Sequence, residues 1–256
     1  MSNLEEGHVN TSIENGVGTI EFGHPKSNSL PGKVLRKLAQ TITDLGADNA
    51  VKVIVLTSAG DRAFCAGASF DELISIQDYP TGKEFFMGFA RVINAARKCP
   101  KFIIGRVQGK AVGGGVGMAS AVDYCMATKH ASVKLSELAI GIGPFVVGPA
   151  VERKMGASAM SELAINATEW RSAEWAKEKG LYTEVFESTE EMDSAISSLT
   201  ARLAKNNPEA MQLLKTAFWE SCGDWDTLLE LRAEMSGRLV LSDFTVNAIN
   251  AFKQKA

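Results

Sequence analysis

Four glycines lie between Gly113 and Gly117, and a run of small apolar residues, 118–122, follows them directly. This pattern predicts a short helix that begins in the glycine cluster. The first N–H groups of a helix have no partner inside it and lie at the positive end of its dipole, so bare glycine backbone there forms a site for negative charge. The anion is either a phosphate or a charged reaction intermediate, and the rest of the sequence favours the intermediate.

The charge balance of the chain argues against large polyanionic partners. Its 256 residues include 27 basic and 30 acidic side chains, with no long block of either sign. We therefore expect neither a nucleic-acid groove nor a membrane-binding surface, and the expected partner is a small molecule. A chain of this length buries a large core as one large domain, or as a domain with a small appendage.

Cysteine and histidine usage predicts neither a disulfide framework nor a metal site. The four cysteines are scattered without C-x-x-C spacing, and the three histidines do not cluster with them. We accordingly expect no metal. The N-terminal residues are polar and acidic, and no uncharged apolar run is long enough to cross a bilayer, so we expect a cytoplasmic protein.

Hydrophobic patterning predicts alternating strands and helices. Asn15-Gly16 between two alternating segments, 10–14 and 17–22, is typical of a β-hairpin. Apolar residues at helical spacing predict a helix over 34–45, and the β-branched run 51–57 predicts a buried strand.

The pattern continues toward the C-terminus. We expect a helix over 82–98, a strand over 102–107, a strand pair at 124–128 and 132–135, and a helix near 147–155. From Thr189 onward the pattern is helical, with Pro208 as a helix start and Gly223 as a break. The prediction is an α/β fold with a core over residues 1–188 and a helical region over 189–256.

A second small-residue turn, Phe64 to Ser69, follows the strand predicted to end near Thr57. Its glycine lets the backbone approach a ligand closely. Two such turns could each donate one N–H to a single oxygen and form an oxyanion hole. Taken alone, either turn is more commonly a packing device than a catalytic one.

These motifs resemble the crotonase superfamily, the enoyl-CoA hydratases and isomerases. Residues 64–68, Phe-Cys-Ala-Gly-Ala, are similar to its F-x-A-G-A-D signature, and residues 107–115 are similar to its N-G-x-A-x-G-G-G segment. Residues 24–30 resemble its R-P-x-x-x-N-A-L loop, and the likeness continues through 176–181 to 251–255. It therefore covers nearly the whole chain.

The resemblance implies a spiral of ββα units with a C-terminal helical trimerisation region, assembled as a homotrimer or a dimer of trimers. It implies an acyl-CoA thioester as substrate and no separate cofactor, since coenzyme A is part of that substrate. The N–H groups of Ala68 and Gly114 would hold the thioester oxygen as it gains enolate charge. Lys26 and Lys255 would contact the CoA phosphates, unless they are solvated surface lysines. Further substrate-binding positions are Ala66, Gly67, Ser69, Phe70, Gly113 and Phe145.

Hydratases of this family use two glutamates, and this chain matches only one of them. Gly117 occupies the first position and Glu137, 20 residues further on, the second. Where dienoyl-CoA isomerases and a related dehalogenase carry an aspartate, this chain has Phe145. Apolar neighbours would raise the pKa of Glu137 toward neutrality, which suits a group that must act as both base and acid. The competing interpretation of Glu137 is a surface carboxylate or a helix-start residue.

A lone carboxyl beside an oxyanion hole suits double-bond isomerisation, from a 3-enoyl to a 2-enoyl thioester, with Glu137 removing the proton at C2 and returning it at C4. Two alternatives stay open: a hydratase that uses Glu137 and an ordered water, and a member of this fold that binds acyl-CoA without turnover. Whether Asp71, Glu72 or Glu84 serves as a second acid is also open.

Two nucleotide-binding motifs match less well. Gly115-x-Gly117-x-x-Ser120 mimics a dinucleotide fingerprint but is separated from the preceding predicted strand by residues 108–112. A P-loop is excluded because Gly109-Lys110 is followed by Ala111 rather than serine or threonine.

Overall fold

A β-hairpin opens the fold in the computed structural model, which describes residues 7–253. Strands β1 (His8–Glu14) and β2 (Val17–Gly23) pair antiparallel. Both turn residues have positive φ, 51° at Asn15 and 82° at Gly16, as a tight hairpin turn requires. The predicted hairpin is confirmed.

The hairpin begins a six-stranded sheet with the order β1-β2-β3-β5-β7-β9, parallel from β2 onward. Its other members are β3 (Val53–Ser58), β5 (Ile103–Val107), β7 (Tyr124–Thr128) and β9 (Glu184–Phe186). Every residue of β3 is buried, which explains its continuous apolar run. The strands predicted over 51–57 and 102–107 are confirmed, with starts one or two residues later.

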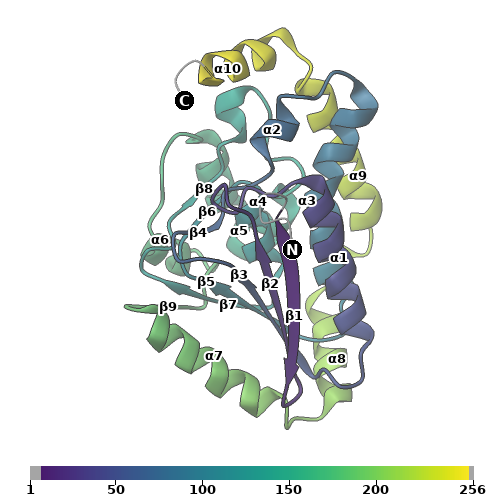
Figure 1. The fold of residues 1–256 in the computed structure, drawn as a ribbon, viewed down its shortest axis with the longest axis vertical. Helices are drawn as coiled ribbons and strands as arrows, with labels where there is room; N and C mark the ends of the chain where they lie inside the picture. The colour runs from purple at the N-terminus through teal and green to yellow at the C-terminus, as the bar shows by residue number, and fades with distance from the viewer. Residues whose placement is uncertain (1–6, 254–256) are drawn as a thin grey trace.

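A second, three-stranded parallel sheet has the order β4-β6-β8 and consists of β4 (Ala63–Cys65), β6 (Lys110–Val112) and β8 (Val133–Lys134). In Figure 1 these strands lie together above the large sheet. The predicted pairing of 124–128 with 132–135 is wrong, because β7 and β8 belong to different sheets. Segment 108–112, expected to separate a strand from the glycine helix, instead contains β6.

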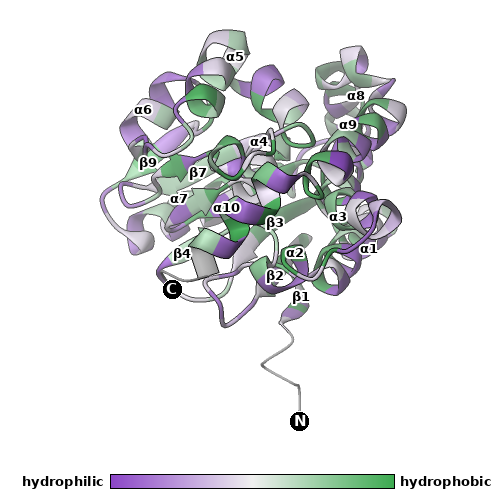
Figure 2. Ribbon diagram, turned by 90° about the horizontal axis from the view of Figure 1, so that it is seen from above, coloured by the Kyte–Doolittle hydropathy of each residue, from purple (hydrophilic) through white to green (hydrophobic). Residues whose placement is uncertain are grey.

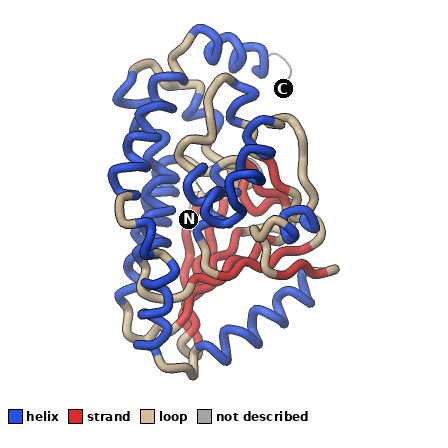
Figure 3. The backbone as a smooth tube through the Cα atoms, turned by 180° about the vertical axis from the view of Figure 1, so that it is seen from behind, coloured by secondary structure: helices blue, strands red, loops and turns tan. Residues whose placement is uncertain are grey.

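Successive side chains of β3 point to opposite faces of the large sheet, so the core is divided into a cluster on each face. Ile54 and Leu56 pack in the main cluster with α1 (Gly32–Ala47) and α3 (Tyr79–Lys98). Val53 and Val55 pack in a second cluster with α7 (Thr189–Leu203) and α8 (Pro208–Phe218). Figures 1 and 3 show helices on both sides of the strands, and Figure 2 shows predominantly hydrophobic strands between helices of mixed character.

The remaining helices are α2 (Phe70–Leu73), α4 (Gly114–Ala121), α5 (Gly148–Ile165), α6 (Ala173–Glu178), α9 (Trp225–Leu239) and α10 (Asp243–Lys253). Helix α3 starts three residues before the predicted position because Asp78 caps it, accepting a hydrogen bond from Thr81 N at 2.8 Å. The helix expected near 147–155 is the first part of α5, which has a kink with non-helical backbone at Gly156 and then continues to Ile165. The helical C-terminus and the start at Pro208 are confirmed, and the division at residue 188 stays a prediction.

A buried ion pair ties α8 to the centre of the fold. Lys215 Nζ donates to Asp123 Oδ2 at 2.6 Å, and both side chains are 5% exposed or less. The same carboxylate accepts from Ile103 N at 2.8 Å and from Trp219 Nε1 at 3.0 Å. Asp123 follows α4, so the pair fixes the end of the glycine-led helix.

We predict that Lys215→Met lowers the free energy of unfolding by about 3 kcal/mol or more, because it leaves a buried carboxylate without its cation. Chemical denaturation measures the loss. Lys129→Met is the control, since it breaks an exposed pair with Glu187 and should cost less than about 1 kcal/mol. Equal losses in the two variants would contradict the prediction.

Candidate active site

Three chain segments meet at one edge of the small sheet. Because β4, β6 and β8 are parallel neighbours, the residues that follow them emerge side by side. These are the turn 66–69 after β4, Gly113 and Gly114 after β6, and Ser136 and Glu137 after β8. The two glycine-containing turns and the carboxyl group identified in the sequence are therefore brought together.

The turn after β4 is held by the loop 24–30. Ala66 N donates to Ser27 O at 3.2 Å, Leu30 N donates to Gly67 O at 2.8 Å, and the Ser29 hydroxyl donates to Ala68 O at 2.8 Å. These bonds occupy the carbonyl groups of the turn and fix its orientation. In the described part of the chain, the Ala68 N–H donates to no turn, loop or side-chain acceptor.

The turn after β6 depends on Gly113, whose φ of 52° is a left-handed conformation that favours glycine. Gly113 N donates to Lys134 O at 2.9 Å, which fixes the turn against β8. Gly114 is the first residue of α4, so its N–H has no acceptor within the helix. A Cβ placed on Gly67 would lie 3.8 Å from Gly114 N, so the two turns are adjacent.

The Glu137 side chain lies against Gly113: a Cβ on that glycine would lie 2.8 Å from Glu137 Oε1. Within residues 7–253 the buried Oε2 atom has no hydrogen-bond partner. Burial raises the pKa of Glu137 to about 7, and nearby backbone N–H groups oppose the shift only in part. A carboxyl group with this pKa exchanges a proton readily in both directions near neutral pH.

The turns and Glu137 line a cavity of about 550 Å³. Of the expected positions, Ala66, Gly67, Ala68, Phe70, Gly113, Gly114, Glu137 and Phe145 line it. Sequence reasoning missed an aromatic wall from α3 and two residues near the β8 side, namely Phe85, Phe86, Phe89, Lys134 and Trp170. Helical periodicity placed the phenylalanines on α3, but no sequence signal indicated what that face would cover.

Two expected substrate-binding residues are not in the cavity lining. Ser69 caps α2, accepting a hydrogen bond from Glu72 N at 3.3 Å. Lys26 forms an exposed ion pair with Asp71. Lys255 lies outside the described residues.

Two glycines of the cluster serve close packing. A Cβ on Gly115 would lie 2.5 Å from Cys65 O, and one on Gly117 would lie 2.5 Å from Val147 Cγ1. The Gly117 position, where the family's hydratases carry a glutamate, therefore has no space for a side chain unless Val147 moves. Close packing of α4 on β4 and α5 requires glycine at these two positions. That requirement accounts for the glycine spacing that is similar to a dinucleotide fingerprint.

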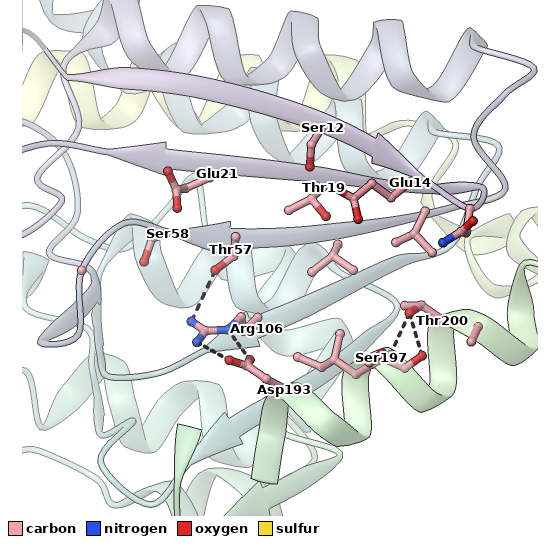
Figure 4. A pocket seen from close by; sticks show the side chains of 16 residues that line it. Ser12, Glu14, Thr19, Glu21, Thr57, Ser58, Arg106, Asp193, Ser197 and Thr200 are labelled. Atoms are coloured by element: carbon pink, nitrogen blue, oxygen red, sulfur yellow. Dashed lines mark hydrogen bonds and ion pairs between the residues drawn. The ribbon is translucent and has the colours of Figure 1, made fainter. Parts of the chain in front are cut away.

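A second hollow, of about 620 Å³, lies on the outer face of the large sheet beside α7. Figure 4 shows Arg106 pointing toward Asp193 of α7, and the Nε–Oδ1 and Nη2–Oδ2 distances are 2.5 and 3.0 Å. The guanidinium charge is therefore already paired. Since the Glu137 carboxyl has no such partner, we place the chemistry in the first cavity.

Comparison with known proteins identifies the class. A solved enoyl-CoA hydratase from Mycobacterium avium has a TM-score of 0.85 and 27% identity, over 100% of this chain and 98% of that one. The fold is that of the crotonase superfamily. The enoyl-CoA hydratase/isomerase family model matches residues 12–255, and the chain belongs to this family.

Two curated relatives are hydratases by name. The short-chain-enoyl-CoA hydratase of Clostridium acetobutylicum is 27% identical over 254 residues, 98% of this chain and 97% of the relative. The mitochondrial methylglutaconyl-CoA hydratase of Homo sapiens is 28% identical over 263 residues, 100% of this chain and 77% of the relative. Among the residues described here, no helix is long and apolar enough to span a membrane, and no cluster of three potential metal ligands occurs.

We predict that Gly113→Ala abolishes activity, because its Cβ would displace the Glu137 carboxyl. Gly156→Ala is the matched control: Gly156 also has positive φ, 82°, but a Cβ there meets nothing within 4 Å. Both variants should lose about 1–3 kcal/mol of stability from backbone strain, because the φ and ψ of each glycine lie in a region that L residues rarely adopt. Steady-state kinetics on the folded variants tests this prediction. An active Gly113→Ala enzyme would contradict the assigned geometry.

Proposed function

We propose that this protein isomerises acyl-CoA thioesters, converting 3-enoyl to 2-enoyl groups, with Glu137 as the single general acid and base. The observation that carries the proposal is one buried carboxyl group whose Oε2 atom has no partner and whose pKa is raised to about 7, lying against Gly113 beside two adjacent turns with unoccupied N–H groups. It rests on the membership of an acyl-CoA family.

In the proposed reaction, the Glu137 carboxylate removes a proton from C2. The C2–H electrons form a C1=C2 bond, and the C1=O π electrons move to the thioester oxygen, which carries the negative charge of the dienolate. The Ala68 and Gly114 N–H groups hold that oxygen, and losing one such donor typically costs about 3 kcal/mol of transition-state stabilisation. Glu137 then returns the proton to C4. When C4 is protonated, the C3=C4 electrons form the new C4–H bond, the C1=C2 electrons form C2=C3, and the C1=O bond is restored. One carboxyl group completes the cycle, and no atom is gained or lost.

Hydration is the second candidate, and the names of the relatives favour it. Adding water across C2=C3 is served best by two carboxyl groups, one to activate the water and one to protonate C2. Val147 occupies the space that a side chain at position 117 would need. We therefore rank isomerisation first.

We also propose a homotrimer, or a dimer of trimers, assembled through the C-terminal helices. Exposed apolar side chains of α8 and α9 include Leu213, Leu214, Phe218 and Leu231, each about half exposed or more. Exposed apolar side chains of this kind are typical of a subunit interface.

We predict that Glu137→Gln reduces isomerisation of a 3-enoyl-CoA by about 10²–10⁴-fold, because the amide cannot accept the C2 proton. Product analysis with 3-enoyl and 2-enoyl thioesters side by side separates isomerisation from hydration. In D₂O, a carboxyl group shielded from solvent should return some of the original C2 proton to C4. Part of the 2-enoyl product should therefore carry no deuterium at C4. Unchanged turnover by the variant would remove Glu137 from the mechanism, and a hydroxyacyl product would favour the hydratase.

We predict that kcat/KM rises with pH and levels off above about pH 7, because only deprotonated Glu137 removes a proton. Rate profiles from pH 5 to 9 measure this dependence. A flat profile through pH 7 would show that another group limits the reaction.

The same titration lowers the stability of the folded state as the pH rises, whereas it raises the activity. The folded-state pKa of Glu137 is raised from 4.5 to about 7, so the folded chain binds more protons between these values. This contribution to stability is present at low pH and is lost as the pH rises through 7. The unfolding free energy of Glu137→Gln, relative to the unsubstituted protein, should therefore increase from pH 5 to pH 8, as denaturation at both pH values would show.

A further inference from the structure

Two lysines and one tryptophan form a cationic cluster at the β8 side of the candidate cavity: Lys134 and Trp170 line the cavity, and Lys110 contacts the same tryptophan. The ammonium groups of Lys110 and Lys134 lie 4.8 and 4.6 Å from the centre of the Trp170 ring. Both distances are within cation–π range. Both ammonium groups therefore contact the same ring.

The small sheet explains why these side chains meet. Along β8, Val133 and Leu135 are buried in the core, so Lys134 faces the opposite side, toward the cavity. In β6, Val112 is the register partner of Lys134, and Lys110, two residues earlier, shares that side.

The backbone also holds Trp170 in place. Val133 N donates to Arg171 O at 2.9 Å, and Arg171 N donates to Val133 O at 3.0 Å. This antiparallel bridge sets the residue before Arg171 beside the residue after Val133. Trp170 is therefore fixed beside Lys134 by main-chain hydrogen bonds.

The charges of this cluster are unbalanced. No carboxylate among residues 7–253 forms an ion pair with either lysine, although several other lysines in the same range are paired. Glu137 is the one acidic residue in the described cavity lining, and its carboxyl group forms no ion pair with Lys134. Two cations on one tryptophan ring, without a counter-charge, favour binding of an anion.

We propose that Lys110 and Lys134 bind a carboxylate at the far end of the acyl group, so that the enzyme prefers thioesters of dicarboxylic acids. This inference rests on the proposed function. In the sheet order β4-β6-β8, the turn after β4 leads into α2, where Asp71 pairs with Lys26, the expected contact for the CoA phosphates. A thioester held at the central turns, with its CoA on the β4 side, directs its acyl end toward β8, Lys134 and Trp170.

The test compares two substrates that differ only at the acyl terminus, 3-hexenedioyl-CoA and 3-hexenoyl-CoA. Charge-assisted hydrogen bonds are the stronger class, so we expect kcat/KM to favour the dicarboxylic substrate by at least about tenfold. The double variant Lys110→Met/Lys134→Met should lose that preference. Lys177→Met/Lys179→Met, which removes two exposed charges at the C-terminal end of α6, should retain both the preference and the turnover of 3-hexenoyl-CoA.

N-acetylcysteamine thioesters of the same acids distinguish the two possible anions, because they lack the CoA phosphates. We expect the unsubstituted enzyme to keep its preference with them. If the lysine variant instead weakens both CoA substrates equally and leaves the N-acetylcysteamine thioesters unaffected, the cluster binds phosphate and the proposal is wrong. Equal kcat/KM for the two acids would also overturn it. Inactivity toward every thioester, in contrast, would refute the proposed isomerisation itself.

Discussion

Parallel pairing of β4, β6 and β8 is the constraint on which the site depends. These strands have only two or three residues each, yet their register decides which backbone groups emerge together at one edge. The main-chain contacts between them leave no room for side chains: a Cβ on Gly109 would lie 2.2 Å from Arg62 O. The glycines therefore let two distant segments approach until the turns that follow them are adjacent.

Charge accounting explains how one buried carboxyl group can serve the proposed chemistry. The cavity holds a negative charge on Glu137 before proton removal, and a negative charge on the thioester oxygen after it. The charge moves toward the N-terminus of α4, where the helix dipole and free N–H groups favour it. Because burial raises the pKa of Glu137, transfer of the proton to its carboxylate becomes less unfavourable.

Features with a local physical signal could be predicted from the sequence. The hairpin follows from Asn15-Gly16, and α1 from apolar residues at helical spacing. Strands β4, β6 and β8 are too short to show a period, so the small sheet could not be inferred from patterning. Glu137 was singled out by family resemblance and not by any local pattern. Trp170 joins the cavity through one antiparallel bridge between distant segments, which no single-sequence pattern encodes.

Gly113 links the backbone geometry to the chemistry. Its positive φ turns the chain from β6 into α4, and its missing Cβ leaves the space in which the Glu137 carboxyl lies. With ψ at −113°, Gly113 lies outside the left-handed helical region that asparagine and aspartate tolerate, and any Cβ would also collide with that carboxyl. The requirement for glycine therefore comes from two independent constraints, and only the second involves the proposed acid–base group. The same residue ties the turn to β8 through Lys134 O, so the helix N-terminus and the lysine-bearing strand are held as one unit.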